Sequence, residues 1–216
     1  MNNFALISEG ITDQVTIENI LYGHYEDDLD ITSIQPARDA TDENRQSAAG
    51  GWERVLEYLC LEDFKKIFLF NEFVIIHIDT DCGDHPNFGV QLTSNGKDRE
   101  PQQIINDVTF LLRSKIGADV YAEYQERIIF AIAVDCIECW LLPLHSKIHA
   151  HKVKKKNCEA ALNFNLQKAG VDYTKDYLGY MLLTRQFKSR SSIKICKTLN
   201  ESFAFFIDSL PAEINA

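Results

Sequence analysis

The amino-acid sequence predicts an α/β protein with an open, mostly parallel four-stranded sheet and helices on both faces. Residues 1–145 alternate four times between a short apolar run and a stretch with helical spacing of apolar residues. This order is typical of parallel α/β sheets. After residue 150 only helical patterns continue. We therefore predict an α/β domain over residues 1–150, with a basic helical segment over residues 151–216 packed on it.

The four strands are predicted at residues 4–8, 31–35, 73–78 and 128–134. The last two are continuous apolar runs rich in Ile, as in strands buried on both faces. Four helices are expected between and after the strands: from an N-cap at Thr12 to Tyr22, over 52–61, from Pro101 to Ile116, and up to Leu144. Residues 37–51 are polar and predict a loop or a helix start, and residues 82–99 predict a long loop. Two or three helices are expected after residue 150, the last from near Ser191 to before Pro211.

Composition places the chain among ordinary globular proteins. It has 216 residues, of which 45% are hydrophobic and 11% aromatic, so it can bury a core and disorder is not expected. Its apolar runs are too short to span a bilayer. The first residues lack the basic and apolar regions of a signal peptide. The six cysteines are too sparse for a disulfide scaffold, so we expect them to be reduced and the protein to be cytoplasmic.

Charge is distributed unevenly along the chain. Residues 151–216 carry 11 Lys or Arg and 6 Asp or Glu, a balance of +5, against −15 for residues 1–150. A basic segment on an acidic body is typical of proteins with a polyanionic partner, although solvated surface explains much of such an asymmetry. Candidate phosphate-binding residues lie in two basic clusters: Lys154, Lys155 and Lys156, and Arg185, Lys188 and Arg190.

Acidic residues follow three of the four predicted strands. In chain order they are Glu9 and Asp13, Asp79 and Asp81, and Asp135 and Glu138. Ligands of open α/β sheets bind at the carboxyl ends of the strands, so these acids are expected to share one edge. Crowded carboxylates repel each other, and a divalent cation such as Mg²⁺ or Mn²⁺ would relieve that repulsion. The competing interpretation is that single acids only cap the helices that follow.

Two of these segments resemble a known family. The run Ser8-Glu9-Gly10-Ile11-Thr12-Asp13 after the first strand, together with His77-Ile78-Asp79-Thr80-Asp81 after a buried strand, is similar to the Toprim domain. That domain occurs in topoisomerases, bacterial primases and overcoming-lysogenization-defect nucleases. The similarity covers about residues 4–145 and is closest to the last group and to standalone Toprim-like proteins of phage-defence loci.

The resemblance implies a Toprim-like fold and a metal-dependent nuclease acting on DNA or RNA in bacterial anti-phage defence. It implies that Glu9 is a metal ligand or general acid/base, that Asp79 and Asp81 hold Mg²⁺, and that Asp13 contributes to a second metal. Either Asp135 or Glu138 is the later acid for that metal. No G-x-x-x-x-G-K-[ST] motif is present, so energy coupling would need a partner ATPase or another defence-system protein.

A second interpretation is a non-catalytic binding or regulatory subunit that needs a partner protein. A primase-type nucleotidyl transferase is a weaker third. The sequence does not decide whether the substrate is DNA or RNA, whether one or two metal ions bind, or whether the protein is a homo-oligomer or a monomer. Cys136 and Cys139 form a C-x-x-C pair, followed by three histidines at positions 145, 149 and 151. We interpret them as core cysteines and surface histidines, because their spacing is too short for a zinc finger.

Overall fold

The computed structural model describes residues 2–27, 29–38 and 51–214, and four strands form its main sheet. These strands are β1 (Asn2–Ile7), β2 (Ile31–Gln35), β3 (Asn71–Asp79) and β6 (Ile128–Ala133). They pair in the order β2-β1-β3-β6, and every pairing is parallel. The predicted α/β class with a four-stranded parallel sheet is therefore confirmed. Part of the polar stretch 37–51, namely residues 39–50, lies outside the described residues.

Successive residues of the central strands serve two different cores. On β1, Phe4 and Leu6 join the hydrophobic cluster on one face, whereas Ala5 and Ile7 join the cluster on the other. All four side chains are fully buried. Alternation across a strand places neighbouring side chains on opposite faces. This explains why the strand sequences are continuously apolar.

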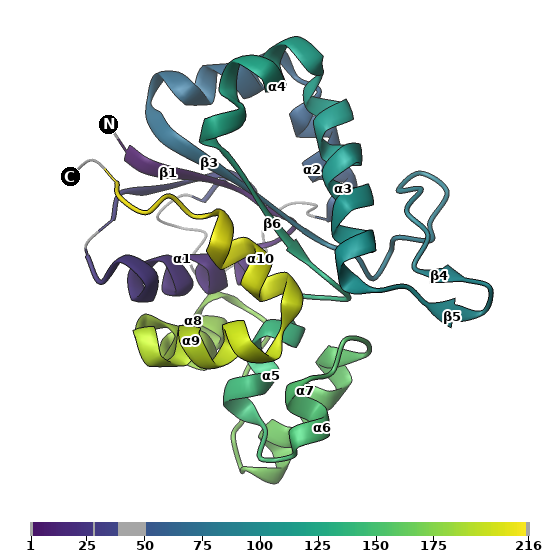
Figure 1. The fold of residues 1–216 in the computed structure, drawn as a ribbon. Helices are drawn as coiled ribbons and strands as arrows, with labels where there is room; N and C mark the ends of the chain where they lie inside the picture. The colour runs from purple at the N-terminus through teal and green to yellow at the C-terminus, as the bar shows by residue number, and fades with distance from the viewer. Residues whose placement is uncertain (1, 28, 39–50, 215–216) are drawn as a thin grey trace.

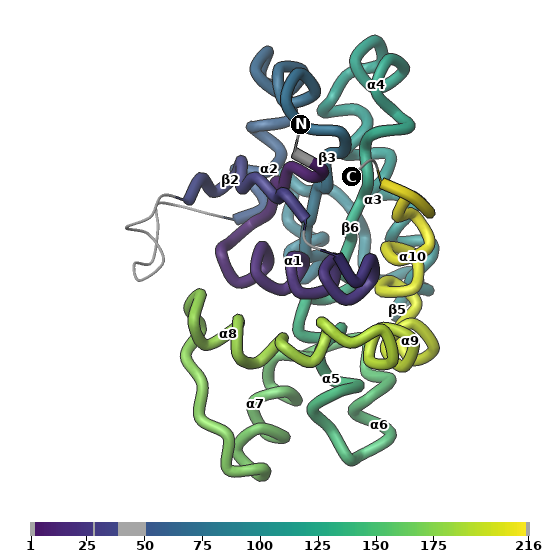
Figure 2. The backbone as a smooth tube through the Cα atoms, turned by 90° about the vertical axis from the view of Figure 1, so that its left-hand side faces the viewer, coloured from purple at the N-terminus to yellow at the C-terminus, as the bar shows by residue number. Residues whose placement is uncertain are grey.

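Helices cover both faces of the sheet (Figures 1 and 2). One face carries α2 (Trp52–Leu59), the 3₁₀ segment η2 (Glu62–Leu69), α3 (Pro101–Ile116) and α4 (Ala118–Tyr124), followed by η3 (Gln125–Arg127). The other face carries α1 (Ile11–Tyr25) and the helices after β6. These are α5 (Glu138–His145), α6 (His149–Lys152), α7 (Cys158–Lys168), α8 (Tyr177–Leu183), η4 (Thr184–Lys188), α9 (Arg190–Leu199) and α10 (Glu201–Ser209). None of the described helices is long and apolar enough to cross a membrane.

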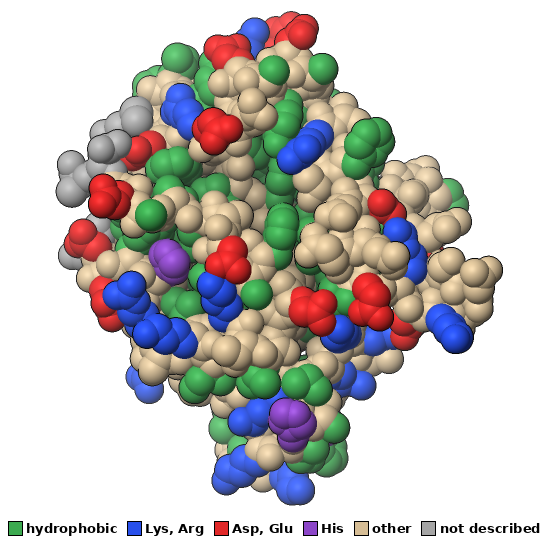
Figure 3. All heavy atoms as spheres, viewed as in Figure 1, with side chains coloured by type: hydrophobic (Ala, Val, Ile, Leu, Met, Phe, Trp, Pro, Cys, Tyr) green, Lys and Arg blue, Asp and Glu red, His purple; other side chains and the backbone are tan. Residues whose placement is uncertain are grey.

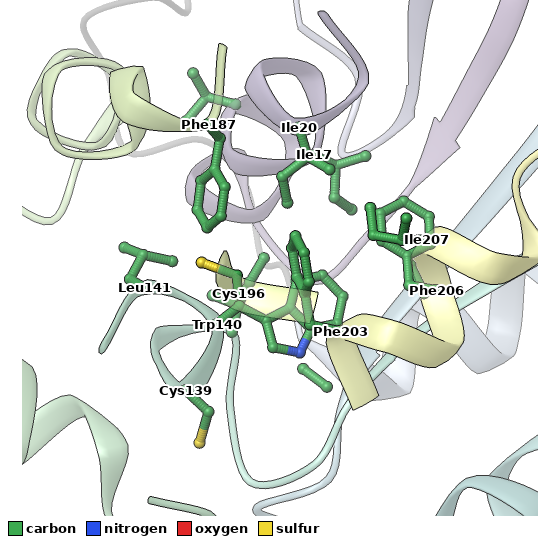
Figure 4. Close-up of a cluster of buried hydrophobic side chains, with 14 of the residues drawn as sticks. Ile17, Ile20, Cys139, Trp140, Leu141, Phe187, Cys196, Phe203, Phe206 and Ile207 are labelled. Atoms are coloured by element: carbon green, nitrogen blue, oxygen red, sulfur yellow. The ribbon is translucent and has the colours of Figure 1, made fainter. Parts of the chain in front are cut away.

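Trp140 of α5 joins the C-terminal helices to the core under α1 (Figure 4). Its ring stacks on Phe206 at 5.6 Å and meets Phe203 edge-on at 5.4 Å, both from α10. The indole N–H donates to Oγ of Ser202 at 2.9 Å, so the polar atom of this buried ring is satisfied. The segment after residue 150 therefore shares one core with α1.

Helix α10 lies beside β6, the strand at one end of the sheet (Figure 1). Oγ of Ser202 also accepts a hydrogen bond from the backbone N–H of Val134 at 3.3 Å, just after β6. An uncovered edge strand exposes unpaired backbone groups. The end of the chain therefore shields this edge.

Three local expectations were wrong. Helix α1 begins at Ile11 with Gly10 as N-cap, not at Thr12, because the carboxylate of Asp13 accepts the Gly10 N–H at 2.8 Å. The last predicted helix is two helices, because Asn200 ends α9 and its side chain caps α10 through the N–H of Phe203. Four α-helices of the described chain therefore begin after residue 150, where two or three were expected. The loop 82–99 contains a short hairpin of β4 (Thr93–Ser94) and β5 (Lys97–Asp98).

Candidate metal centre

The carboxyl ends of β1, β3 and β6 lie together at one edge of the sheet. Ile7 of β1 pairs with Ile76 of β3, and Asp79 at the end of β3 pairs with Ala133 of β6. Glu9 follows β1 by two residues, and Asp135 follows β6 by the same number. The sheet register therefore brings the acids predicted at three strand ends to a common edge.

Backbone groups fix Glu9 against β3. Its Oε1 accepts the N–H of Asp79 at 2.7 Å, and its backbone carbonyl accepts the N–H of Gly51 at 2.8 Å. The N–H of Trp52 at the start of α2 is a further donor to the Glu9 carboxylate. Glu9 is therefore held between the end of β3 and the start of α2.

Burial and mutual repulsion raise the pKa values of three carboxyl groups at this edge. Burial, then the charge of Asp13, raises the pKa of Glu9 to about 8. Burial, then the charge of Glu138, raises the pKa of Asp13 to about 7. Burial followed by the charges of Asp13 and Glu9 raises the pKa of Asp79 well above its usual range. Without a cation the site therefore favours protonated carboxyl groups at neutral pH.

His77 of β3 lies between two of these acids. Its Nδ1 is 3.9 Å from Oδ2 of Asp13, and its Nε2 is 3.4 Å from Oδ1 of Asp79. The ring is fully buried, yet neither ring nitrogen makes a hydrogen bond within the described chain. Burial lowers the pKa of His77 to about 3, so the ring is neutral. It therefore supplies no positive charge to the carboxylates.

Glu138 at the start of α5 completes the buried group. Its Oε1 accepts the hydroxyl of Tyr180 at 2.5 Å and lies 3.5 Å from Nζ of Lys175. Burial raises the pKa of Glu138, but hydrogen bonds from Cys136 and Tyr180 together with the charge of Lys175 outweigh it, so the net pKa is lowered. Glu138 is thus the ionised member, and its charge raises the pKa values of Asp13 and Asp79.

Asp135 and Asp81 are placed differently from these four acids. Oδ2 of Asp135 accepts the backbone N–H of Cys158 at 3.0 Å and contacts Sγ of Cys136 at 3.5 Å. Its charge is not among the larger influences on the pKa values of Asp13 and Asp79. Of the two open choices for the later acid, the structure therefore brings Glu138 to the cluster and not Asp135. Asp81 is exposed, but its charge raises the pKa of Glu9.

The residues present fit a hard divalent cation. Oδ1 of Asp79 is buried and has no hydrogen-bond partner among the described residues. The acidic donors at this edge, Glu9, Asp13, Asp79 and Asp81, all offer carboxylate oxygens, which Mg²⁺ and Mn²⁺ prefer. A cation would satisfy the Asp79 oxygen and offset the repulsion that burial makes costly.

The sequence did not indicate three residues that contact the acids. These are His77, which lies between Asp13 and Asp79, and Lys175 and Tyr180, which contact Glu138. His77 was visible only as part of the motif that ends β3. Lys175 and Tyr180 are 37 and 42 residues beyond Glu138, and no local pattern marks them. Their contact with Glu138 depends on how α8, and the segment directly before it, packs against α1.

The two predicted basic clusters lie in different places. Lys155 pairs with Glu201 at 2.6 Å and Lys156 with Asp98 at 2.9 Å. Both lysines line a pocket of about 210 Å³, next to Thr80 and Asp135. This cluster is therefore close to the acidic edge. Figure 1 places α5, α6 and α7 in the lower part of the molecule. In the same view, Figure 3 shows Lys and Arg side chains on the surface of this part.

Lys188 and Arg190, of the second basic cluster, lie away from the edge that carries the acids. The Lys188 ammonium lies over the Tyr22 ring at 5.1 Å, and Arg190 pairs with Glu26 at 3.3 Å. Both partners are at the C-terminal end of α1, whereas Asp13 is in its first turn. Along the helix axis Tyr22 lies about 14 Å and Glu26 about 20 Å from Asp13. Arg185, in η4, lines a separate pocket with His145 and Tyr173.

The expectation that all six cysteines are reduced was wrong for two of them. Cys139 and Cys158 form a disulfide between α5 and α7. Cys60, Cys82, Cys136 and Cys196 are free. The C-x-x-C spacing concealed this pairing, because the partner of Cys139 lies 19 residues further along the chain. The prediction that Cys136 and Cys139 are core residues is confirmed, as both are buried. Of the three histidines, His149 is exposed, and His145 and His151 are half-buried.

Comparisons of the chain with protein-family models, with curated proteins and with solved structures found no match. We therefore infer the function from the residues and the geometry of the site.

Proposed function

We propose that this protein is a metal-dependent nuclease of the Toprim type, which hydrolyses phosphodiester bonds of DNA or RNA. The observation that carries the proposal is the buried cluster of Glu9, Asp13 and Asp79. The His77 ring between Asp13 and Asp79 and the Oδ1 atom of Asp79 make no hydrogen bond among the described residues. Such a cluster is unfavourable without a cation. It also lies where ligands bind to parallel sheets.

Glu9, Asp79 and Asp81 would hold the first Mg²⁺, and Asp13 with Glu138 are the nearest acids for a second. When bound, the cation supplies a polarised water molecule and positive charge for the phosphate oxygens. Burial raises the pKa of Glu9 to about 8 while no cation is bound, so its carboxyl group would release a proton when it binds the cation.

Two lysines at the edge support a polyanionic substrate. Lys155 and Lys156 lie beside Asp135 and Thr80, directly after the β6 and β3 ends. Their present partners, Glu201 and Asp98, are exposed, and exposed ion pairs contribute little free energy. Exchanging these carboxylates for backbone phosphates would therefore cost little. Lysine–phosphate contacts supply most sequence-independent affinity for nucleic acids.

The test is incubation of the purified protein with supercoiled and linear DNA, single-stranded DNA and RNA, each with Mg²⁺, Mn²⁺ or EDTA. We expect cleavage with a divalent cation, none with EDTA, and loss of cleavage in Asp79→Asn and Glu9→Gln. Asp63→Asn is a matched control, because Asp63 is an exposed acid paired with Lys66 in η2. Metal-dependent binding of nucleic acid without cleavage would overturn catalysis and favour the binding-subunit interpretation.

A further inference from the structure

Three cysteines and Asp135 meet where β6 passes into α5. Oδ2 of Asp135 is 3.5 Å from Sγ of Cys136 and 3.7 Å from Sγ of Cys139. These three ligand atoms all lie within 4.8 Å of one another. The sulfur of Cys158 is adjacent, since it is bonded to that of Cys139. Four potential metal-ligating side chains therefore share one small volume.

The fold holds these side chains in place. Cys139 and Cys158 are fully buried and Cys136 is nearly so. Asp135 adopts a φ of 69°, in the left-handed region that non-glycine residues seldom occupy. Thr80 stabilises this conformation, because its Oγ1 accepts the N–H of Asp135 and its own N–H donates to the Asp135 carbonyl, both at 2.9 Å. A strained backbone kept by surrounding hydrogen bonds is typical of functional positions.

The donor set has the chemistry of a zinc site. Thiolates select Zn²⁺ over Mg²⁺, and structural zinc sites are tetrahedral with four protein ligands. Zn–S bonds of about 2.3 Å place tetrahedral ligand atoms somewhat under 4 Å apart. The contacts of Asp135 with Cys136 and Cys139 match this separation. The zinc interpretation considered from sequence combined Cys136 and Cys139 with the histidines that follow, whereas the third sulfur here is that of Cys158 in α7.

We propose that Asp135, Cys136, Cys139 and Cys158 bind one Zn²⁺ when all three cysteines are reduced. This site is distinct from the acidic cluster and does not depend on the proposed nuclease activity. With four protein ligands it has no open position, so its role is structural. It would join the end of β6 to α7 and would anchor the segment of Lys154, Lys155 and Lys156 that directly precedes Cys158.

The disulfide and the zinc site are alternative states of the same side chains. A phosphine reductant supplies two electrons to the Cys139–Cys158 bond, water supplies the two protons and the oxygen, and the products are two thiols and the phosphine oxide. Binding of Zn²⁺ to the three thiols then releases their protons. The Cys136 thiol takes no part in the disulfide. Substituting Cys136 therefore removes a zinc ligand and leaves the disulfide cysteines in place.

The experiment measures bound zinc per chain after purification with a phosphine reductant and removal of free metal. We expect about one Zn²⁺ per chain in the wild type and in Asp79→Asn, and a large loss in Cys136→Ser and Asp135→Asn. Cys196→Ser is the matched control, because Cys196 is a buried free cysteine of α9 outside this cluster. It should retain zinc. Circular dichroism compares the folding of the variants.

A second arm uses only the wild-type chain, so it does not depend on whether a variant folds. Titration of the reduced, metal-free protein with Co²⁺ should give thiolate charge-transfer and intense visible bands of a tetrahedral site, which saturate at one equivalent and disappear when Zn²⁺ is added. Absence of these bands, or zinc content equal in wild type and Cys136→Ser, would overturn the proposal. Retention of the disulfide with no bound metal under reduction would do the same.

Discussion

The carboxylate of Glu9 accepts a hydrogen bond from the backbone N–H of Asp79 at 2.7 Å, across 70 residues of sequence. This bond joins the two segments whose motifs carry the functional argument. It also keeps a buried acid close to Asp79, whose pKa its charge helps to raise. The pair is unfavourable when both groups are ionised, and a cation removes that penalty.

Replacing Asp79 by Asn should stabilise the metal-free protein while abolishing its stabilisation by Mg²⁺. On folding without a cation, Asp79 must either keep a charge that repels Glu9 and Asp13 or take up a proton, because its pKa is raised. The neutral amide removes both costs but cannot replace a carboxylate as a ligand. We expect a gain of about 1 kcal/mol, or roughly 2–4 °C in Tm for a chain of this size. Thermal melts at pH 8 in EDTA and in Mg²⁺ measure both effects. Equal Mg²⁺ stabilisation of wild type and variant would show that Asp79 is not a ligand.

Stability of the metal-free protein should fall as the pH rises from about 6.5 to 8.5. The pKa values of Asp13 and Glu9 are raised by burial to about 7 and about 8. In this window the folded chain binds more protons than the unfolded chain, so the free energy of unfolding decreases with pH. Chemical denaturation at several pH values in EDTA checks the slope. Mg²⁺ and the Asp13→Asn substitution should each flatten it, and a flat profile in EDTA would contradict the prediction.

His77 should stay neutral in the folded protein down to about pH 4. Burial lowers its pKa to about 3, and its neighbours Asp13 and Asp79 keep their protons in the same range. Because the unfolded chain does bind a proton below about pH 6.5, His77 reduces stability progressively as the pH falls toward 3. NMR of the labelled imidazole measures its protonation. A signal of the imidazolium form at pH 5.5 in the folded state would refute this.

Removing Lys155 and Lys156 should weaken nucleic-acid binding similarly for all sequences. Each lost phosphate contact should reduce the slope of log affinity against log salt concentration by roughly one unit. The free energy of unfolding should change by less than about 1 kcal/mol, because the ion pairs of both lysines are exposed. Fluorescence titration of oligonucleotides at several salt concentrations gives both quantities. The double variant Lys188→Ala and Arg190→Ala removes the same charge at the far end of α1, so its affinity should be closer to that of the wild type. Equal losses in the two variants would indicate a general charge effect.

Substituting Gly23 by Ala should destabilise the fold by about 2 kcal/mol or more. A Cβ at this position of α1 would lie 1.8 Å from the backbone carbonyl of Phe187, and backbone cannot move aside cheaply. Gly10→Ala is the control, since its Cβ would meet no atom closer than 3.5 Å. Urea denaturation of both variants measures the difference. Similar midpoints would mean that α1 and η4 adjust without cost.

The order of strands and helices and the gathering of acids at one edge could be predicted because both depend on short-range patterns. A continuous apolar run marks a buried strand wherever it pairs, and parallel strands bring their carboxyl ends to the same side. The direction in which a side chain points after a strand end could not be predicted in this way, because contacts with residues far along the chain decide it. Asp135 accepts a hydrogen bond from the backbone N–H of Cys158 in α7. Glu138 accepts one from the hydroxyl of Tyr180 and lies close to Lys175.

The sequence by itself therefore determined the α/β class, the strand segments and the set of acids that reach the candidate site. The tertiary structure alone decided which acids form the buried cluster, that His77 lies between two of them, and that Cys139 meets Cys158. The physical reason is the separation along the chain between the residues that determine each feature. Periodicity and strand composition are encoded within about ten residues, whereas burial, repulsion and sulfur proximity arise from elements that the chain brings together only after it has folded.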